Sequence, residues 1–471
     1  MGWTGSDTVR LRDALELSRQ QFADRLGVSL GVVKKWASRG ETIVLDEFHA
    51  GLMDTALTRA TPVQRSRYLA VRQQVVALAP GAVEVLAPQF DWGADPTVLA
   101  ANLTRRDLLV DRRTVGQAIA SMIVGVSLLE PLERWLMRDQ ALPAPLVAGA
   151  GTEEIGQLEN VAQAFHEWDD AHGGGLRRMA VVGQLREVSD LLQDRQPATI
   201  ERRLLRVQAL LAETAATMSW DSRRPGDQET AQGYYLLAVR AAKQAGDPAL
   251  CANAMAGIAR QLLSLDHYGT VTERAQLQHD RATDALEIVR LAQDRLSDRV
   301  TPTVRALLAT REAWAYAKLG RPEAFRRACE KAEDAYADAA PADDPYWVQY
   351  FDAAELTGTI GGRLLEIARN DTDFAGEAAE TITSAIALRR PDRRRSSALD
   401  HLGVLEARLI EGEIEEACRL GHAAVDAAGQ TASDRVRRKL TRIYDRTGQL
   451  ASIRDVTTLR DRMRPLVGAA T

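Results

Sequence analysis

The stretch SRQQFADRLGVSLGVVKKWASR, residues 18–39, contains two short helical patterns that meet at a glycine. Ser18 is a suitable N-cap for the first helix, because a serine side chain can accept a hydrogen bond from the free N–H groups of a first helical turn. Phe22 and Leu26 then fall on one face of that helix. Gly27 can adopt the left-handed conformation that ends a helix, so it predicts a turn.

A second helix follows this turn almost at once. Ser29 is a suitable N-cap for it, and Val33 and Trp36 would form its inner face. Two helices joined by a turn of three or four residues that contains glycine form the helix-turn-helix pattern. The sequence therefore predicts a small helical bundle near the N-terminus, built around such a turn.

This stretch resembles the XRE (phage-repressor-type) helix-turn-helix family. The sequence departs from the family pattern in two places. Arg19 takes the place of the usual Gln, and residues 36–40 carry one extra residue and lack the usual Glu after Trp36. The residues that match the family pattern are Leu17-Ser18, Phe22-Ala23, Leu26-Gly27-Val28-Ser29, Val33 and Trp36.

The resemblance implies that the second helix, expected over residues 29–37, enters the major groove of double-stranded DNA and reads base edges there. Since Val33 and Trp36 would belong to the core, the other side chains would face outward. Val32 could touch a thymine methyl group, and the basic side chains suit phosphates. The candidate DNA-binding residues are Arg19, Gln20, Ser29, Leu30, Gly31, Val32, Lys34, Lys35 and Arg39.

The charge of this region agrees with that expectation. Residues 9–40 hold seven Arg or Lys against three Asp or Glu, whereas the whole chain of 471 residues has 60 basic and 65 acidic side chains, a net charge of −5. The positive charge is therefore local, which argues against a nucleic-acid-coating role for the whole chain. A plain helical bundle with a solvated basic face is the alternative interpretation.

The cysteines and the hydropathy pattern indicate a reducing compartment. Cys251, Cys329 and Cys418 lie far apart in helical patterns, which matches neither a disulfide framework nor a zinc site. No signal peptide is apparent, and the longest apolar run, residues 115–129, is too short and too polar for a transmembrane helix. We therefore expect a cytoplasmic protein, no membrane partner, and three core cysteines.

Composition shifts divide the chain into three predicted parts. Residues 1–79 form the helix-turn-helix domain, which begins with a loose tail over residues 1–8 and ends with a helix that starts at Thr61-Pro62. Residues 80–151 contain several prolines and are typical of a linker with helical pieces. Residues 152–471 form antiparallel helix pairs almost throughout.

The helix pairs share start signals and a loose internal repeat. Thr301-Pro302, Asp247-Pro248 and Asp344-Pro345 each place a capping residue before a proline. Residues 312–332 resemble a tetratricopeptide repeat, and residues 405–424 repeat the scheme of a Leu-rich helix, a turn with glycine and small residues. The expected helices are 204–218, 229–245, 248–265, 281–295, 302–319, 322–339, 354–368, 376–388, 395–410, 414–428 and 434–447. The predicted fold class is therefore all-α: an N-terminal helix-turn-helix bundle followed by an α-solenoid of tetratricopeptide-like helix pairs.

The order of these parts adds a second resemblance. The chain resembles the actinobacterial XRE–tetratricopeptide regulators linked to sporulation and antibiotic production, and more distantly the peptide-pheromone receptors of Gram-positive bacteria. These resemblances imply a homodimer that binds a DNA operator, and repeats that receive a peptide or small-molecule effector. Most aromatic residues of such an array belong to its core, but some can line the ligand-receiving face. The ligand-binding candidates are Trp314, Tyr346, Trp347, Tyr350 and Phe351.

No constellation of residues supports catalysis, a metal or a cofactor. His166 and His172 are six residues apart and do not share a helix face, so a helix end that runs into the glycines of residues 173–175 is the better interpretation. The arginine-rich run of residues 389–395 could bind phosphates or an acidic ligand, or could be a solvated loop. We therefore do not expect an enzyme.

The sequence as a whole predicts a sequence-specific DNA-binding transcriptional regulator, whose helical repeats sense an effector and set the geometry of dimeric DNA binding. The alternative belongs to another class: a protein-interaction scaffold that uses the repeats and carries a vestigial helix-turn-helix.

Overall fold

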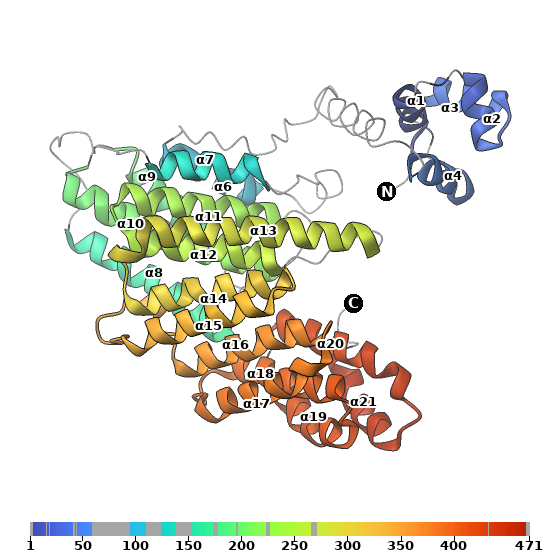
Figure 1. Cartoon of the computed structure of the whole chain (residues 1–471). Helices are drawn as coiled ribbons and strands as arrows, with labels where there is room; N and C mark the ends of the chain where they lie inside the picture. The colour runs from blue at the N-terminus through green and yellow to red at the C-terminus, as the bar shows by residue number, and fades with distance from the viewer. Residues whose placement is uncertain are drawn as a thin grey trace. The chain divides into compact units, whose positions relative to one another are not determined.

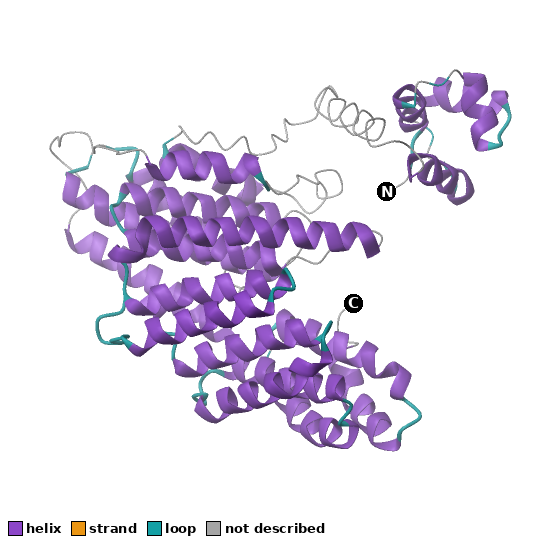
Figure 2. Ribbon diagram, viewed as in Figure 1, coloured by secondary structure: helices purple, strands orange, loops and turns teal. Residues whose placement is uncertain are grey.

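The computed structural model describes residues 3–15, 17, 19–40, 43, 45–58, 95–109, 124–137, 152–172, 178–194, 196–222, 227–264, 271–431 and 433–467. Every regular element within these residues is a helix (Figure 2), so the all-α prediction is confirmed for the part of the chain described. The chain forms two compact units, Met1–Gln89 and Phe90–Thr471. The predicted helix at Thr61-Pro62 lies outside the described residues.

The first unit consists of short helices (Figure 1), and the described residues of these helices share one small core. α3 contacts both α1 and α2, and α4 contacts the same two helices. The core contains the large side chains of Leu11, Phe22, Val33, Trp36 and Met53. The helices are α1 (Gly5–Ala14), α2 (Arg19–Leu26), α3 (Leu30–Arg39) and α4 (Glu47–Thr58).

The start of the first unit differs from the predicted loose tail. Trp3 is buried, its carbonyl accepts a hydrogen bond from the Leu45 N–H at 2.8 Å, and α1 already begins at Gly5. A Cβ atom at Gly5 would lie 2.2 Å from the Trp36 carbonyl oxygen, so only glycine allows this close approach to α3. The prediction is therefore wrong from Trp3 onward, because these contacts come from residues distant in sequence.

The second unit is a long succession of helices (Figure 1). The expected helices between residues 204 and 447 all occur, and α10 and α13 are longer than expected, whereas α21 was not expected. The helices are α6 (Pro96–Leu109), α7 (Val126–Met137), α8 (Thr152–His172), α9 (Arg178–Leu191), α10 (Ala198–Ser222), α11 (Asp227–Gln244), α12 (Pro248–Ser264), α13 (Val271–Leu296), α14 (Pro302–Lys318), α15 (Pro322–Ala337), α16 (Ala353–Ala368), α17 (Ala375–Leu388), α18 (Arg394–Glu411), α19 (Ile414–Gly429), α20 (Asp434–Arg446) and α21 (Arg454–Val467), with short 3-10 helices that include η3 (Tyr346–Val348).

Two kinds of contact organise the second unit. From α9 to α21 each helix contacts the next one along the chain. In addition, α10, α12, α14, α16, α18 and α20 contact one another in that order, and we call these six helices the even layer. Contacts also join distant parts of the chain, because α20 contacts α10 and α18 contacts α8.

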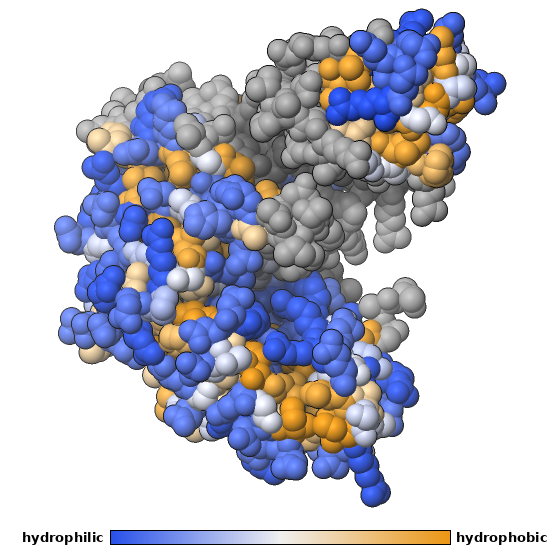
Figure 3. Space-filling view, turned by 45° about the vertical axis from the view of Figure 1, so that its right-hand side comes forward, coloured by the Kyte–Doolittle hydropathy of each residue, from blue (hydrophilic) through white to orange (hydrophobic). Residues whose placement is uncertain are grey.

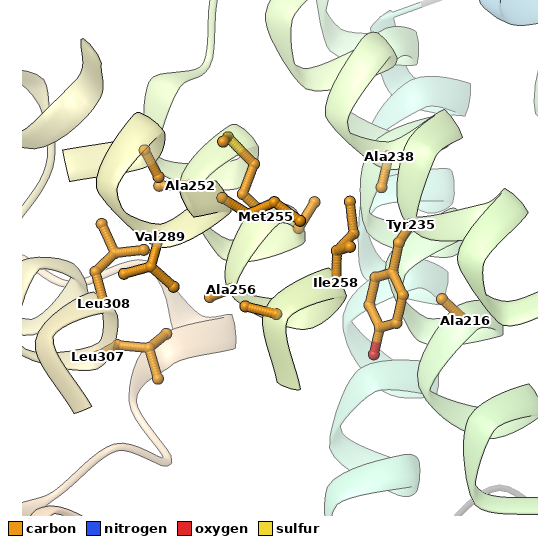
Figure 4. Packing of buried hydrophobic residues seen from close by; sticks show 14 of the residues in the cluster. Ala216, Tyr235, Ala238, Ala252, Met255, Ala256, Ile258, Val289, Leu307 and Leu308 are labelled. Carbon is orange, nitrogen blue, oxygen red and sulfur yellow. The ribbon is translucent and has the colours of Figure 1, made fainter. Parts of the chain in front are cut away.

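The core between α10 and α14 shows why these helices pack closely (Figure 4). Tyr235 of α11 is fully buried beside small residues such as Ala216 of α10. A Cβ atom at Gly257 of α12 would lie 2.4 Å from the Tyr235 ring, so glycine makes room for the tyrosine. Met255 and Leu308 carry the same core on into α12 and α14.

The described part of the predicted linker, residues 80–151, packs within the second unit. α6 contacts α9 and α11, and α7 contacts α13. Asp107 of α6 forms an ion pair with Arg178 and accepts a hydrogen bond from the Tyr234 hydroxyl at 2.8 Å. The N–H of Gly125 donates to Asp284 Oδ2 at 2.7 Å.

Two of the three predicted start signals act as expected. The Thr301 hydroxyl accepts a hydrogen bond from the Val304 N–H, and Asp247 caps α12 in the same way. Asp344-Pro345, however, precedes only η3, and the Asp344 carboxylate accepts from the Thr303 hydroxyl at 2.5 Å instead. Asp352 caps α16. The prediction of an α-helix start at Asp344-Pro345 is therefore wrong.

The surface of the second unit is mostly hydrophilic on the face that Figure 3 shows, with smaller apolar areas between the polar side chains. Within the described ranges, no helix combines the length and the apolar character needed to cross a membrane.

Candidate functional site

The first candidate site lies on α2, α3 and the three-residue turn that joins them. Gly27 has a φ of 69°, in the left-handed region that favours glycine, so the turn forms where it was predicted. Ser29 caps α3, because its Oγ accepts a hydrogen bond from the Val32 N–H at 3.4 Å. Gly40 follows the last residue of α3, and its N–H donates to the Trp36 carbonyl.

The two faces of α3 have opposite character. Val33 and Trp36 are only 3% and 4% exposed and belong to the core of the first unit. The Trp36 ring meets the His49 ring of α4 edge-on, with 5.2 Å between their centroids. Lys34 and Lys35 are exposed. A fixed apolar face thus holds a basic face toward solvent.

None of the nine predicted DNA-binding residues is buried. Gln20 donates from its Nε2 to Asp24 Oδ1 at 2.8 Å, an exposed contact within α2. Leu30 and Val32 are half-buried. The exposed members are Arg19, Gln20, Ser29, Gly31, Lys34, Lys35 and Arg39.

The five predicted ligand-binding aromatics are not brought together at one site. Trp347 and Phe351 are buried in the core of the second unit, and Tyr350 packs against that core. The Tyr346 ring lies edge-on to the His166 ring, 5.8 Å away, where η3 contacts α8. Only Trp314 lines the cavity described next.

The second candidate site is a cavity of about 230 Å³ that is lined by all six helices of the even layer. Eight of its 22 lining residues are Lys or Arg and three are Asp or Glu, in a chain whose net charge is negative. The charged and aromatic lining residues are Trp220, Trp314, Lys318, Glu355, Arg363, Glu366, Arg369, Arg389, Asp400, Arg435, Arg438, Lys439 and Arg442. We call this cavity the basic pocket.

The acidic groups of the basic pocket already have cationic partners within the protein. Glu366 accepts from Lys318 Nζ at 2.9 Å and lies 2.8 Å from Arg369 Nη1. Arg389 forms ion pairs with the other two acids, at 2.7 Å from Glu355 and 2.8 Å from Asp400. Burial alone would raise the pKa of the Glu366 carboxyl, but the cations around it hold that pKa below its ordinary value.

Two further cations of the basic pocket contact an aromatic ring or the backbone. The guanidinium of Arg435 lies 5.2 Å from the centroid of the Trp220 ring. Lys439 donates from Nζ to the Leu399 carbonyl at 3.1 Å. Burial lowers the pKa of the Lys439 ammonium to about 8 and that of the Arg435 guanidinium to about 10.

The sequence carried a signal for the α20 side of the pocket. Arg435, Lys439 and Arg442 recur at helical spacing, beside the buried face of Val436 and Leu440. This strongly amphipathic pattern marks a cationic stripe. It does not reveal that the stripe meets Trp220 of a distant helix.

The arginine-rich run of residues 389–395 forms ion pairs within the protein. Arg390 pairs with Asp392, and Arg393 pairs with Asp170 of α8. Arg395 lies 3.8 Å from Asp170 and 3.7 Å from Asp221 of α10. The run therefore ties α18 to α8 and α10 and is not simply a solvated loop. Beside it, burial raises the pKa of the Asp169 carboxyl to about 7, and the Asp221 charge adds to that rise.

Among the described residues, no group of three His, Cys, Asp or Glu side chains is arranged to hold a metal ion. The chain matches no protein-family model, no curated protein and no solved structure.

Proposed function

We propose that the chain is a DNA-binding transcriptional regulator of the helix-turn-helix class. The observation that carries this proposal is the opposition of the two faces of α3. Val33 and Trp36 fix the helix from inside, while Lys34 and Lys35 face solvent together with the half-buried Val32. A helix that enters the major groove needs such a surface, with cations for phosphates and short side chains for base edges.

The same proposal gives the second unit the role of sensor and dimerisation domain. Its stacked helix pairs support an α-solenoid of tetratricopeptide-like repeats, a fold class that offers continuous surfaces to ligands. Binding of an effector would shift the population between two arrangements of the repeats. If two copies present α3 to DNA, the half-sites are about one helical turn, or a multiple of it, apart.

Fluorescence anisotropy across a salt series tests the proposal. The full chain is titrated with double-stranded DNA from upstream of its own gene and with a scrambled control. We expect selective binding that weakens with salt. The double variant Lys34→Ala/Lys35→Ala should lower the slope of log affinity against log salt by about 2, since each phosphate contact contributes roughly 0.9.

Arg25→Ala is the matched control, because Arg25 is an exposed arginine of α2 outside the nine predicted residues. It should leave the selectivity for the upstream DNA unchanged. If the wild type bound both DNAs equally and the double variant behaved like it, the scaffold alternative would be favoured.

A further inference from the structure

The buried side-chain atoms of the basic pocket that lack hydrogen-bond partners are all donors. Among its lining residues, all of which the structure describes, three buried side-chain atoms lack a hydrogen-bond partner: Trp220 Nε1, Trp314 Nε1 and Arg363 Nε. Each of these atoms carries a hydrogen that it can only donate. A matching ligand therefore offers acceptors.

The positive charge of the pocket also favours a ligand that offers acceptors, and specifically an anion. Glu366, Glu355 and Asp400 are held by Lys318, Arg369 and Arg389, and Glu366 also lies 3.9 Å from Arg363, so three acids face eight cations and the pocket keeps an excess of positive charge. The other five cations are on α16 and α20: Arg363, Arg435, Arg438, Lys439 and Arg442. Arg363, Arg435 and Lys439 are half-buried, and half-buried cations that outnumber the acids beside them are costly unless an anion binds among them.

The size and shape of the pocket narrow the class of anion. A volume of about 230 Å³ holds a small molecule but not an extended length of peptide. Guanidinium groups bind phosphate oxygens with two parallel N–H···O bonds, and a phosphate carries up to two negative charges within a few ångströms. Few apolar side chains line the pocket, which leaves charge and hydrogen bonds to determine affinity.

We propose that the basic pocket binds a small phosphorylated metabolite, whose phosphate oxygens accept hydrogen bonds from Arg363, Arg435 and Lys439. That this metabolite is the effector of DNA binding rests on the proposed function, but its binding to the pocket does not. The position of the pocket explains how such a ligand could act. All six helices of the even layer line the pocket, which lies where α20 meets α10. A bound anion would therefore favour one arrangement of these helices.

Isothermal titration of the full chain with inorganic pyrophosphate at neutral pH tests the binding. We expect one site per chain. The double variant Arg435→Ala/Lys439→Ala should weaken the affinity by roughly 100-fold or more, since hydrogen bonds to charged groups are strong. Arg437→Ala removes a neighbouring arginine of α20 that pairs with Asp434 and does not line the pocket, and it should keep the wild-type affinity within about twofold.

Two further measurements keep the test decisive if the double variant does not fold. The single variant Lys439→Met retains Arg435 and should lose roughly tenfold in affinity. Citrate and an acidic peptide serve as competing anions of other chemistry. Three outcomes would each overturn the proposal. The wild type could fail to bind pyrophosphate, it could prefer citrate or the peptide, or the variants could bind pyrophosphate as tightly as the wild type.

The outcome for DNA is read separately. Pyrophosphate that binds in the titration and changes the affinity for upstream DNA supports the metabolite as effector. Pyrophosphate that binds a chain with no affinity for DNA supports the pocket and counts against the regulator. DNA binding without pyrophosphate binding supports the regulator and counts against the proposed ligand of the pocket.

Discussion

The guanidinium carbon of Arg363 lies 3.4 Å from the centroid of the Trp314 ring, and its Nη1 lies 3.9 Å from Glu366 Oε1. Burial lowers the pKa of this guanidinium to about 9 despite the Glu366 charge. The aromatic face therefore holds a cation that its surroundings do not fully neutralise, at the wall of the basic pocket.

Arg363→Met should separate binding from stability. Glu366 keeps Lys318 and Arg369, so the free energy of unfolding in urea should change by less than about 1 kcal/mol, since relief of the buried charge offsets the lost cation–π contact. The affinity for pyrophosphate should fall roughly tenfold. A loss of stability above about 3 kcal/mol would instead assign Arg363 a purely structural role.

Lys439 should make both stability and anion binding depend on pH. Its pKa is about 8 in the folded chain against an ordinary 10.5, with Glu406 and Asp400 of α18, Arg369 of α16 and Arg442 nearby. The folded state then binds fewer protons than the unfolded chain between these values, so stability rises with pH in this window. Affinity for pyrophosphate should fall over the same window, as titration at pH 7 and pH 9 would show.

The Lys439→Met variant checks the origin of that behaviour. Because it removes a partly desolvated charge, it should raise the free energy of unfolding at pH 7 by about 1–3 kcal/mol, at 1.36 kcal/mol per pKa unit. The gain should disappear above the ordinary pKa of lysine. A variant less stable than the wild type at pH 7 would contradict this account.

Asp169 should give the opposite pH dependence. It is 6% exposed, and its pKa of about 7 lies above the ordinary 3.8. The folded chain therefore holds a proton that the unfolded chain has lost, and stability falls as pH rises from about 4 to 7. Asp169→Asn should be more stable than the wild type by roughly 2–4 kcal/mol at pH 8, and the gain should shrink toward pH 4. Denaturant melts at both pH values measure this.

Trp36→Ala should affect the two units differently. Its loss leaves a cavity in a small core and costs about 3–5 kcal/mol, enough to unfold the first unit and abolish the proposed DNA binding. The pyrophosphate affinity of the second unit should stay unchanged. Circular dichroism, with Lys34→Ala as a folded control, distinguishes loss of structure from loss of contacts.

The sequence predicted the helices well because most of their signals are local. Thr301 and Ser29 cap the helices that follow them through bonds to residues three positions ahead, and Gly27 ends α2 within the same turn. The basic face of α3 could be predicted for the same reason. Its inward and outward residues follow from helical spacing alone.

The basic pocket could not be predicted, because it depends on how distant helices stack. Trp220 and Arg435 meet across the even layer although they belong to α10 and α20. Sequence patterns also could not separate Trp314, which lines the pocket, from Trp347, which fills the core. Trp3 was missed for a related reason, since the backbone partner that orders it is Leu45.

The contact between α10 and α20 has a consequence for how the second unit unfolds. In a linear array of repeats each helix pair contacts only its neighbours, so a terminal pair can unfold while the other pairs stay folded. Here α20, near the end of the unit, contacts α10, near its beginning. The ion pairs of Arg393 with Asp170 of α8 and of Arg395 with Asp221 of α10 add further contacts between distant parts of the chain. Removal of α20 and α21 should therefore loosen the opposite end of the unit, and hydrogen exchange should show the whole stack opening as one cooperative block.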